Sequence, residues 1–150
     1  FRSLLPELNY LTIIKSDIAN LNGVEKFKLL NEINFWYCSK LESIESLKTL
    51  NKNLLKIEFE SCKKIKDIEV LGKLKCLKEA SISNCGEIQS ISFVKDMNNL
   101  EVLKFLKTTI IDGDLSYCEK LKYTAFNDKK HYTHKSVFNI VTGLYDMVKK

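Results

Sequence analysis

The sequence is poor in the residues that separate domains. It holds one proline and five glycines in 150 residues, with no Ser/Gly-rich or low-complexity tract. Because such residues mark turns, linkers and domain boundaries, their scarcity predicts a single domain over residues 1–150. The chain begins at Phe1, without a methionine or a signal peptide, so we expect it to be part of a longer chain.

Long apolar runs are also absent. The longest uncharged apolar string is Phe35-Trp36-Tyr37-Cys38, far short of a membrane span. The five cysteines form no C-x-x-C pair, and no N-x-S/T sequon occurs. An odd number of cysteines in this pattern fits reduced thiols in a cytosolic protein better than the disulfides of a secreted protein. We therefore expect no membrane insertion and a cytoplasmic protein, or one delivered into a host cell if it is an effector.

The usual catalytic motifs are missing as well. There is no Gly-rich phosphate loop, no H-E-x-x-H, and no Ser or Cys nucleophile beside a recognisable base. His131 and His134 would face one way on a helix, but lysines flank them and no carboxylate pair has matching spacing. The acidic residues Asp112, Asp114 and Glu119 are typical of a solvated turn. The sequence predicts no enzyme, no cofactor and no metal, with a two-histidine site as the minor alternative.

What the sequence does contain is a repeat. Between Leu54 and Leu77 the apolar residues follow Leu54-x-x-Ile57-x-Phe59-x-x-Cys62-x-x-Ile65-x-x-Ile68-x-x-Leu71-x-x-Leu74-x-x-Leu77. The two-residue step is typical of a strand with one buried face, and the three-residue step of a 3₁₀-like turn. The unit recurs at intervals of 22, 24, 23, 23 and 21 residues, counted between its first leucines: Leu8, Leu30, Leu54, Leu77, Leu100 and Leu121. This period predicts a solenoid of about six units.

These units match L-x-x-L-x-L-x-x-N/C-x-L, and over about residues 4–128 the chain resembles the leucine-rich repeat family. The period is most similar to that of short bacterial internalin-type repeats, which usually carry Asn where this chain has Cys38, Cys62 and Cys85. The resemblance implies an α/β solenoid with a parallel sheet on the concave face and short 3₁₀, α or irregular segments on the convex face. The expected strands centre on Leu11–Ile13, Ile33–Phe35, Ile57–Phe59, Ala80–Ile82, Leu103–Phe105 and Thr124–Phe126.

The last residues, about 129–150, are expected to cover the end of the solenoid, because its final repeat would otherwise expose an apolar face. Ser136 is available as an N-cap. Apolar residues at helical spacing follow it and predict a C-terminal helical cap: Val137, Ile140, Val141, Leu144 and Val148.

The aligned cysteines Cys38, Cys62 and Cys85 should stack at the strand separation of ~4.8 Å. A straight ladder does not converge on one point, as the four ligands of structural zinc must. We expect buried, reduced, metal-free thiols whose S–H groups serve nearby carbonyls. Cys76 and Cys118 fall in the return segments and should be core or half-exposed.

Alternate strand residues should point out of the concave face. Trp36, the only tryptophan, lies among them beside Tyr37 and near Ile14, and protein interfaces are rich in such side chains. The alternative is that Trp36 is structural and packs against its neighbours or against an upstream segment. The predicted partner-binding residues are Tyr10, Ile14, Asn34, Trp36, Tyr37, Glu58 and Glu60.

The formal net charge of +5 does not come from this face. A nucleic-acid groove needs basic residues along its contact surface, and the surplus lysines fall instead on the return side. The outward positions carry four lysines and five carboxylates, a net charge of −1: Lys15, Lys56, Lys104 and Lys107 against Glu32, Glu58, Glu60, Glu79 and Asp128.

The sequence therefore predicts a non-catalytic module that binds another protein on its concave face, as in an immunity, effector or scaffold protein. A targeting or regulatory domain of a larger enzyme encoded upstream is the main alternative. Nucleic-acid binding through the convex lysines is a third, less favoured one.

Overall fold

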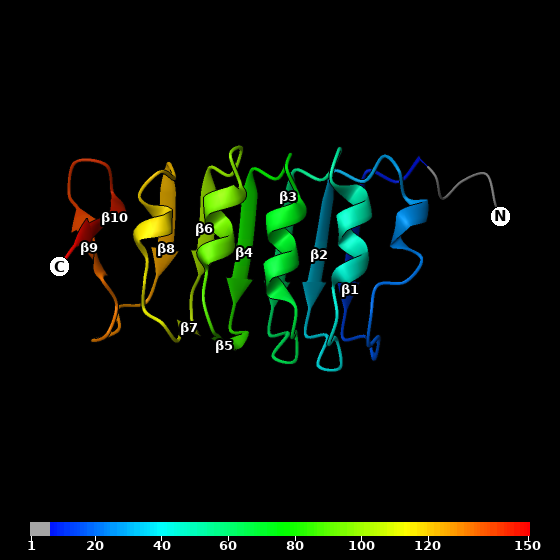
Figure 1. Ribbon diagram of the computed structural model, residues 1–150, viewed down its shortest axis with the longest axis horizontal. Helices are drawn as coiled ribbons and strands as arrows, with labels where there is room; N and C mark the ends of the chain where they lie inside the picture. The colour runs from blue at the N-terminus through cyan, green and yellow to red at the C-terminus, as the bar shows by residue number, and fades with distance from the viewer. Residues whose placement is uncertain (1–6) are drawn as a thin grey trace.

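The main element of the computed structural model, which describes residues 7–150, is a six-stranded parallel sheet (Figure 1). Its order is β1-β2-β3-β4-β6-β8, so each repeat lays its strand beside the previous one. The strands are β1 (Tyr10–Ile14), β2 (Glu32–Trp36), β3 (Lys56–Glu60), β4 (Glu79–Ser83), β6 (Val102–Phe105) and β8 (Tyr123–Phe126). All six predicted strand centres lie within them and every neighbouring pair is parallel, which confirms the predicted register. The predicted start of the repeats at residues 4–6 lies outside the described residues.

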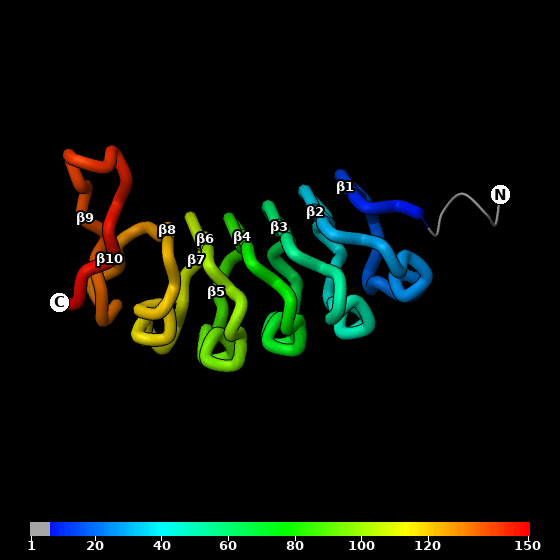
Figure 2. Tube along the Cα trace, turned by 90° about the horizontal axis from the view of Figure 1, so that it is seen from above, coloured from blue at the N-terminus to red at the C-terminus, as the bar shows by residue number. Residues whose placement is uncertain are grey.

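The return segments contain 3₁₀ helices, which lie on the side of the solenoid opposite the sheet. The row of repeats is curved, with the sheet on its concave side (Figure 2). A 3₁₀ turn holds three residues, so apolar residues three apart point to one side. Leu41, Ile44 and Leu47 are accordingly 0% exposed. None of the helices among residues 7–150 is long and apolar enough to cross a membrane. The 3₁₀ helices are η2 (Val24–Lys26), η3 (Glu45–Leu50), η4 (Ile68–Lys73), η5 (Ser92–Asp96) and η6 (Ser116–Cys118).

The core is a set of rows in which the inward side chain of one strand stacks on that of the next. Phe35 and Phe59 are parallel, with ring centroids 5.3 Å apart. Phe105 and Phe126 repeat this arrangement at 5.4 Å. Offset stacking of this kind adds about 0.5–1.5 kcal/mol per pair beyond the burial of area. Tyr132, 2% exposed, contacts Phe126 edge to face and closes the C-terminal end of the row.

Each strand of the first five repeats ends in a corner that holds a non-glycine residue in the left-handed region. These residues have φ between 50° and 59°: Lys15, Tyr37, Ser61, Asn84 and Lys107. In the first three corners the residue's own N–H donates to the next strand, as Tyr37 does to the Glu60 carbonyl at 2.8 Å. This inter-strand bond offsets a conformational cost of about 1–2 kcal/mol.

The next residue in the corner supplies the predicted thiol ladder. The Cys62 thiol donates to the Phe35 and Glu60 carbonyls at 3.4 and 3.6 Å, and the Cys85 thiol to the Phe59 and Ser83 carbonyls at 3.6 and 3.2 Å. In the following repeat Thr108 takes the same role, and its hydroxyl donates to the Ile82 carbonyl at 2.6 Å. Cys38, Cys62 and Cys85 are all buried and free of disulfides, as predicted.

One addition to the fold was not predicted. A short parallel pair, β5 (Gly86–Ile88) and β7 (Thr108–Ile110), links the fourth and fifth repeats beyond their corners. In the fifth return path the chain bends, as expected, at Asp112-Gly113-Asp114. Gly113 has φ 68°, and a Cβ there would lie 2.5 Å from the His131 carbonyl oxygen, so glycine is required for this close approach.

The prediction of a C-terminal helical cap is wrong. The segment forms an antiparallel hairpin of β9 (His134–Asn139) and β10 (Leu144–Lys149). Asn139 begins its turn by accepting the Val141 N–H on Oδ1 at 2.9 Å, and Gly143 ends it at φ 70°. Helical spacing was misleading because this Asn…Gly turn lies inside the apolar run and because the flanking residues are rich in β-branched types.

The hairpin also faces differently from the predicted helix. His134, on the face turned to the body of the protein, is 2% exposed. The apolar residues expected to face the core are instead exposed: Val137 by 41%, Ile140 by 88%, Val141 by 90%, Leu144 by 52% and Val148 by 42%. The hairpin lies at the C-terminal end of the solenoid and projects from it on the side of the sheet (Figure 2).

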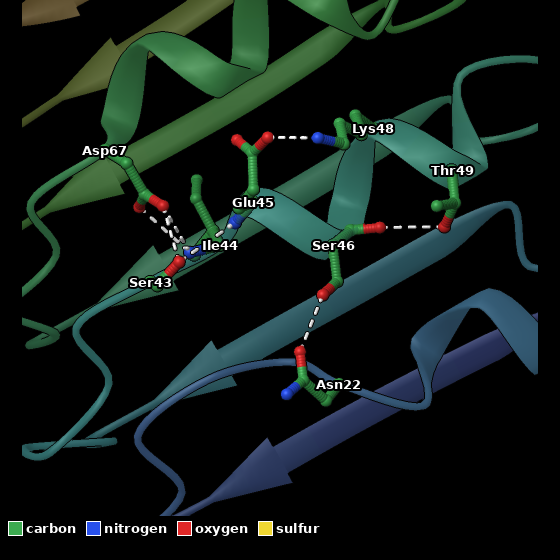
Figure 3. A network of polar contacts seen from close by, with 8 residues as sticks. All are labelled: Asn22, Ser43, Ile44, Glu45, Ser46, Lys48, Thr49 and Asp67. Atoms are coloured by element: carbon green, nitrogen blue, oxygen red, sulfur yellow. Dashed lines mark hydrogen bonds and ion pairs between the residues drawn. The ribbon is translucent and has the colours of Figure 1, made fainter.

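Neighbouring return segments are held together by a carboxylate. Figure 3 shows Asp67, at the start of η4, reaching back to the start of η3 in the preceding repeat. Asp67 Oδ1 accepts the Ile44 N–H at 2.9 Å, and Oδ2 accepts the Ser43 hydroxyl at 2.6 Å. The carboxylate thus satisfies a backbone donor at a helix start that no side chain of its own repeat reaches.

Replacing Asp67 with alanine should lower the free energy of unfolding by about 1–2 kcal/mol, because the Ile44 N–H loses its acceptor. Urea denaturation of the full chain measures this loss. The matched control is Asp17→Ala, which removes a carboxylate paired with Lys40 where both side chains are more than half exposed. An exposed pair contributes less than about 1 kcal/mol. Equal losses in the two variants would contradict the capping role of Asp67.

Of the five thiols, only Cys76 should react promptly with a thiol reagent in the native protein. The other four are buried. Burial raises the pKa of Cys62 to about 11 and the pKa values of Cys85 and Cys118 to about 12, so their reactive thiolate forms are scarce at pH 8. Labelling followed by peptide mass spectrometry, with and without denaturant, measures the rates. Fast native labelling of several thiols, or zinc bound in stoichiometric amount, would refute the ladder assignment.

Candidate functional site

The strands present a continuous outer surface, here called the concave face, made by the side chains that alternate with the core residues. Its N-terminal part carries large apolar groups from β1, β2 and the corner after β2. Tyr10 is 51% exposed, and Ile14 and Tyr37 are each 52% exposed. Trp36 stands directly across from Ile14 in the strand pairing and is partly exposed. The structure therefore places three of the four predicted apolar residues on the adjacent strands β1 and β2 and the fourth, Tyr37, in the corner after β2.

Asn34 occupies the same face but is 2% exposed, which corrects the expectation of an exposed side chain. Its Nδ2 donates to the Tyr10 hydroxyl at 3.2 Å and to Glu32 Oε1 at 3.0 Å. The Tyr10 oxygen also accepts the Thr12 hydroxyl at 2.7 Å. Asn34 thus positions the Tyr10 ring over β2, and direct contact with a partner would require this ring to move.

Two buried polar atoms of β2 have no hydrogen-bond partner among residues 7–150: Asn34 Oδ1 and Trp36 Nε1. Both belong to residues that point to the concave face. An unsatisfied buried donor or acceptor costs about 1–3 kcal/mol. A rearrangement of Trp36 that gives its N–H an acceptor would recover part of this cost.

The charges of the concave face are paired at two places and unpaired at its centre. Lys56 lies 3.5 Å from Glu32, and Lys104 lies 3.0 Å from Glu79, each pair joining adjacent strands. Glu58 and Glu60 on β3 form no ion pair with any described residue; the Glu60 carboxylate accepts the Ser61 hydroxyl at 2.9 Å. The uncompensated negative charge therefore lies one strand away from Trp36.

The C-terminal end of the concave face contains a hollow that the sequence did not indicate. Its volume is about 460 Å³, and its apolar wall is built by Leu106 and Tyr123 from the sheet and Tyr145 from the hairpin. Tyr145 also meets Phe138 edge to face, with centroids 5.2 Å apart, and both rings are more than half exposed. The sequence analysis missed this hollow because it predicted a helix where the hairpin lies. The turn signal of Asn139 and Gly143 could have indicated the hairpin.

The two histidines have different hydrogen-bond partners. His134 Nε2 lies 2.9 Å from Glu119 Oε1, and its Nδ1 lies 2.8 Å from the Thr133 hydroxyl. His131 Nε2 lies 2.9 Å from the Ile110 carbonyl, at the end of β7 in the fifth repeat. In the described part of the chain no three His, Cys, Asp or Glu side chains gather closely enough to hold a metal ion.

Comparison with solved structures finds chains that match the fold of this protein. The chain is similar to an internalin (inlF) from Listeria monocytogenes strain 4b F2365, with a TM-score of 0.59 and 17% sequence identity. The match covers 85% of this chain and 45% of that one, so this chain spans less than half the length of its neighbour. No protein-family model and no curated protein matches the sequence. At this identity the likeness concerns the fold alone: the chain is a solenoid of the leucine-rich repeat type.

Proposed function

We propose that the chain is a non-catalytic module that binds another protein on the N-terminal part of its concave face. The observation that carries this proposal is the cluster of Tyr10, Ile14, Trp36 and Tyr37, three of them about half exposed. Tyrosine and tryptophan are enriched among the residues that dominate binding energy, since they bury much area and lose few rotamers.

The arrangement of the cluster supports a single contact surface. Ile14 and Trp36 are directly paired across β1 and β2, and adjacent strands lie ~4.8 Å apart. Tyr37 follows Trp36 at the corner, where its left-handed backbone holds the ring at the rim of the face. Ile14, Trp36 and Tyr37 therefore lie next to one another, and Tyr10 extends the same face from the start of β1, opposite Glu32.

The unpaired carboxylates suggest the chemistry of the partner. Trp36 pairs with Glu60 across β2 and β3, and Glu58 lies two residues earlier on the same face. A partner that places an apolar side chain against Trp36 and a Lys or Arg beside it would satisfy both features. The carboxylates would contribute to orientation and association rate more than to affinity.

The convex lysines give less support to nucleic-acid binding, because two of them are already engaged within the protein. Lys75 Nζ donates to the Gly72 and Asp96 carbonyls, and Lys120 Nζ to the Lys95 and Met97 carbonyls. These bonds tie neighbouring return segments together. No described feature favours the alternative of a regulatory domain for a larger enzyme. The five free cysteines keep the cytoplasm as the expected compartment.

Truncating Trp36 to alanine should weaken partner binding by about 2 kcal/mol or more, because the variant loses the largest side chain of the patch. The measurement is affinity capture with the purified chain, identification of the partner by mass spectrometry, and titration of that partner against both proteins. Thermal unfolding should change little, since Trp36 lies outside the core rows.

Lys56→Ala is a matched control on the same face, because it removes a partly exposed ion pair with Glu32 and no large apolar side chain. Unchanged partner affinity in Trp36→Ala, or loss of folding in that variant, would mean that Trp36 is structural. The contact surface would then have to lie elsewhere on the protein.

Replacing Tyr37 with asparagine should separate stability from binding. Asparagine tolerates φ near 59° better than tyrosine, so the free energy of unfolding should rise by several tenths of a kcal/mol, while partner affinity falls. Lys107→Asn at the equivalent corner, φ 55°, should give the stability gain without the binding loss. Denaturation curves and partner titrations of both variants test this, and equal partner affinities for the two would exclude Tyr37 from the interface.

A further inference from the structure

Exposed apolar side chains are concentrated on the C-terminal hairpin. Of the fourteen large apolar and aromatic residues that are exposed among residues 7–150, seven lie on β9, β10 or the turn between them. Ile140 and Val141, in the turn, are the most exposed of these. A contiguous exposed apolar surface marks a site of contact with a protein or a membrane. The other five residues are Val137, Phe138, Leu144, Tyr145 and Val148.

The turn lies at the end of the hairpin that projects from the solenoid (Figure 2). At the other end of the hairpin Lys149 pairs with His134. The Lys150 N–H donates to the Thr133 carbonyl there, at 2.9 Å, so the last residue of the sequence lies at the base of the hairpin. A flat surface that approaches the projecting end therefore meets the two aliphatic residues of the turn first.

The turn satisfies its own backbone donors. Asn139 Oδ1 accepts the Val141 N–H at 2.9 Å and the Thr142 N–H at 3.3 Å. The Asn139 carbonyl accepts the Gly143 N–H at 2.9 Å. The Thr142 hydroxyl oxygen accepts the Leu144 N–H at 3.3 Å. Away from water, a backbone N–H without an acceptor is costly, and these four successive N–H groups can leave water without losing theirs.

The side chains change in character from the turn to the base of the hairpin. Directly behind the turn, Phe138 is paired with Tyr145. Lysines follow at the base, at Lys135 and Lys149. The rise of about 3.4 Å per residue places Lys135 roughly 10 Å behind Phe138. This order matches the layers of a membrane surface, where acyl chains are followed by a headgroup layer that favours tyrosine and, when it is anionic, attracts lysine.

The charge of the segment complements an anionic membrane. Residues 129–150 carry five lysines and one aspartate, a net charge of +4 in a chain of +5. The aspartate, Asp146, accepts the Asn139 side-chain amide on Oδ2 at 2.7 Å. The positive charge behind the apolar turn is therefore in surplus. Four of the lysines form no ion pair with a described residue: Lys129, Lys130, Lys135 and Lys149.

We propose that the turn of this hairpin inserts into the surface of a lipid bilayer that contains anionic lipids. Ile140 and Val141 enter the boundary between the headgroups and the acyl chains. Phe138 and Tyr145 lie at the level of the headgroups, and the lysines at the base face the anionic groups. The chain rests on the membrane and does not span it. This contact lies at the opposite end of the solenoid from Trp36 and does not depend on the proposed binding of a protein there.

The first test titrates the full chain with vesicles of phosphatidylcholine that contain about 30% phosphatidylserine. Co-sedimentation measures the bound fraction. Saturable binding is expected, and binding to vesicles of phosphatidylcholine alone should be at least about tenfold weaker, because the lysines then lose their anionic partners. No saturable binding to the anionic vesicles, or equal affinity for the two kinds of vesicle, would overturn the proposal.

Paired variants test the turn. Ile140→Ser combined with Val141→Ser should weaken binding to the anionic vesicles by at least about tenfold, because it removes the inserted apolar area. Leu29→Ser combined with Leu55→Ser removes two exposed leucines of the repeats and should bind like the parent. Circular dichroism checks that both variants fold. Equal affinities of the two variants would contradict insertion of the turn.

A second pair of variants tests the lysines at the base. Lys135→Gln combined with Lys149→Gln should weaken binding to the anionic vesicles by at least about fivefold. Lys52→Gln combined with Lys73→Gln changes the net charge equally on the repeats and should have a smaller effect. Equal losses would show that net charge alone attracts the chain, which would overturn the proposed orientation.

A fluorescent reporter tests insertion without removing any apolar residue from the turn. In a Trp36→Phe background, the emission of Val141→Trp should move to shorter wavelength when anionic vesicles are added, whereas that of Leu29→Trp should not. No shift in the turn variant, or an equal shift in both, would overturn the proposal. So would sedimentation without lipid that shows a dimer of the parent and a monomer of the Ile140→Ser, Val141→Ser variant, because the turn would then contact a second copy.

Discussion

The stacking of each repeat on the next is the interaction on which the rest of the structure depends. A single unit of about 23 residues cannot bury its own inward side chains, since they lie in a layer one strand thick. Leu30, Leu54 and Leu77 reach 0% exposure only because the neighbouring repeats cover them on both sides. The core rows, in which equivalent side chains of successive repeats stack on one another, therefore determine the spacing of the strands. They also determine the position of the corners and the orientation of the concave face.

Interactions between corners keep this stacking in register. The residue in the left-handed conformation turns the chain, its N–H bonds to the next strand in the first three repeats, and the following thiol or hydroxyl reaches carbonyls of its own and the preceding strand. A thiol is a weak donor, so the ladder contributes less hydrogen-bond energy than an amide would, but it adds apolar volume to the core. Asp67, Lys75 and Lys120 make equivalent links between return segments with side chains from adjacent repeats.

Most of the fold could be predicted because the repeat supplies six independent copies of one apolar pattern. The strand centres, the 3₁₀ return segments and the buried thiols all follow from that pattern. The C-terminal hairpin could not be predicted in this way, since it occurs once and its apolar residues, apart from Met147, are exposed. In a segment without repetition, the local turn chemistry of Asn139 and Gly143 was the better guide than periodicity.

The candidate site was predicted less completely, for a physical reason. Strand alternation specifies which side chains point away from the core, and Tyr10 and Ile14 are exposed accordingly, whereas Tyr37 is exposed in the corner after β2. Alternation does not specify which of these outward residues cover one another. Asn34 is buried between Tyr10 and Glu32, to which its side chain is hydrogen-bonded. Exposure on a sheet depends on the sizes of side chains on adjacent strands, which emerge only when the strands are placed side by side.

The two ends of the solenoid differ in how they meet the same requirement. Stacking leaves each terminal repeat with one uncovered side. At the C-terminal end Tyr132 covers this side, and its hydroxyl donates to the Thr108 carbonyl at 3.4 Å. At the N-terminal end of the described residues Leu11, Ile13 and Phe27 are partly exposed. Within residues 7–150 the core rows are thus covered at one end and only partly covered at the other. In a solenoid, unlike a closed globular core, this difference is local, because each repeat contacts only its neighbours.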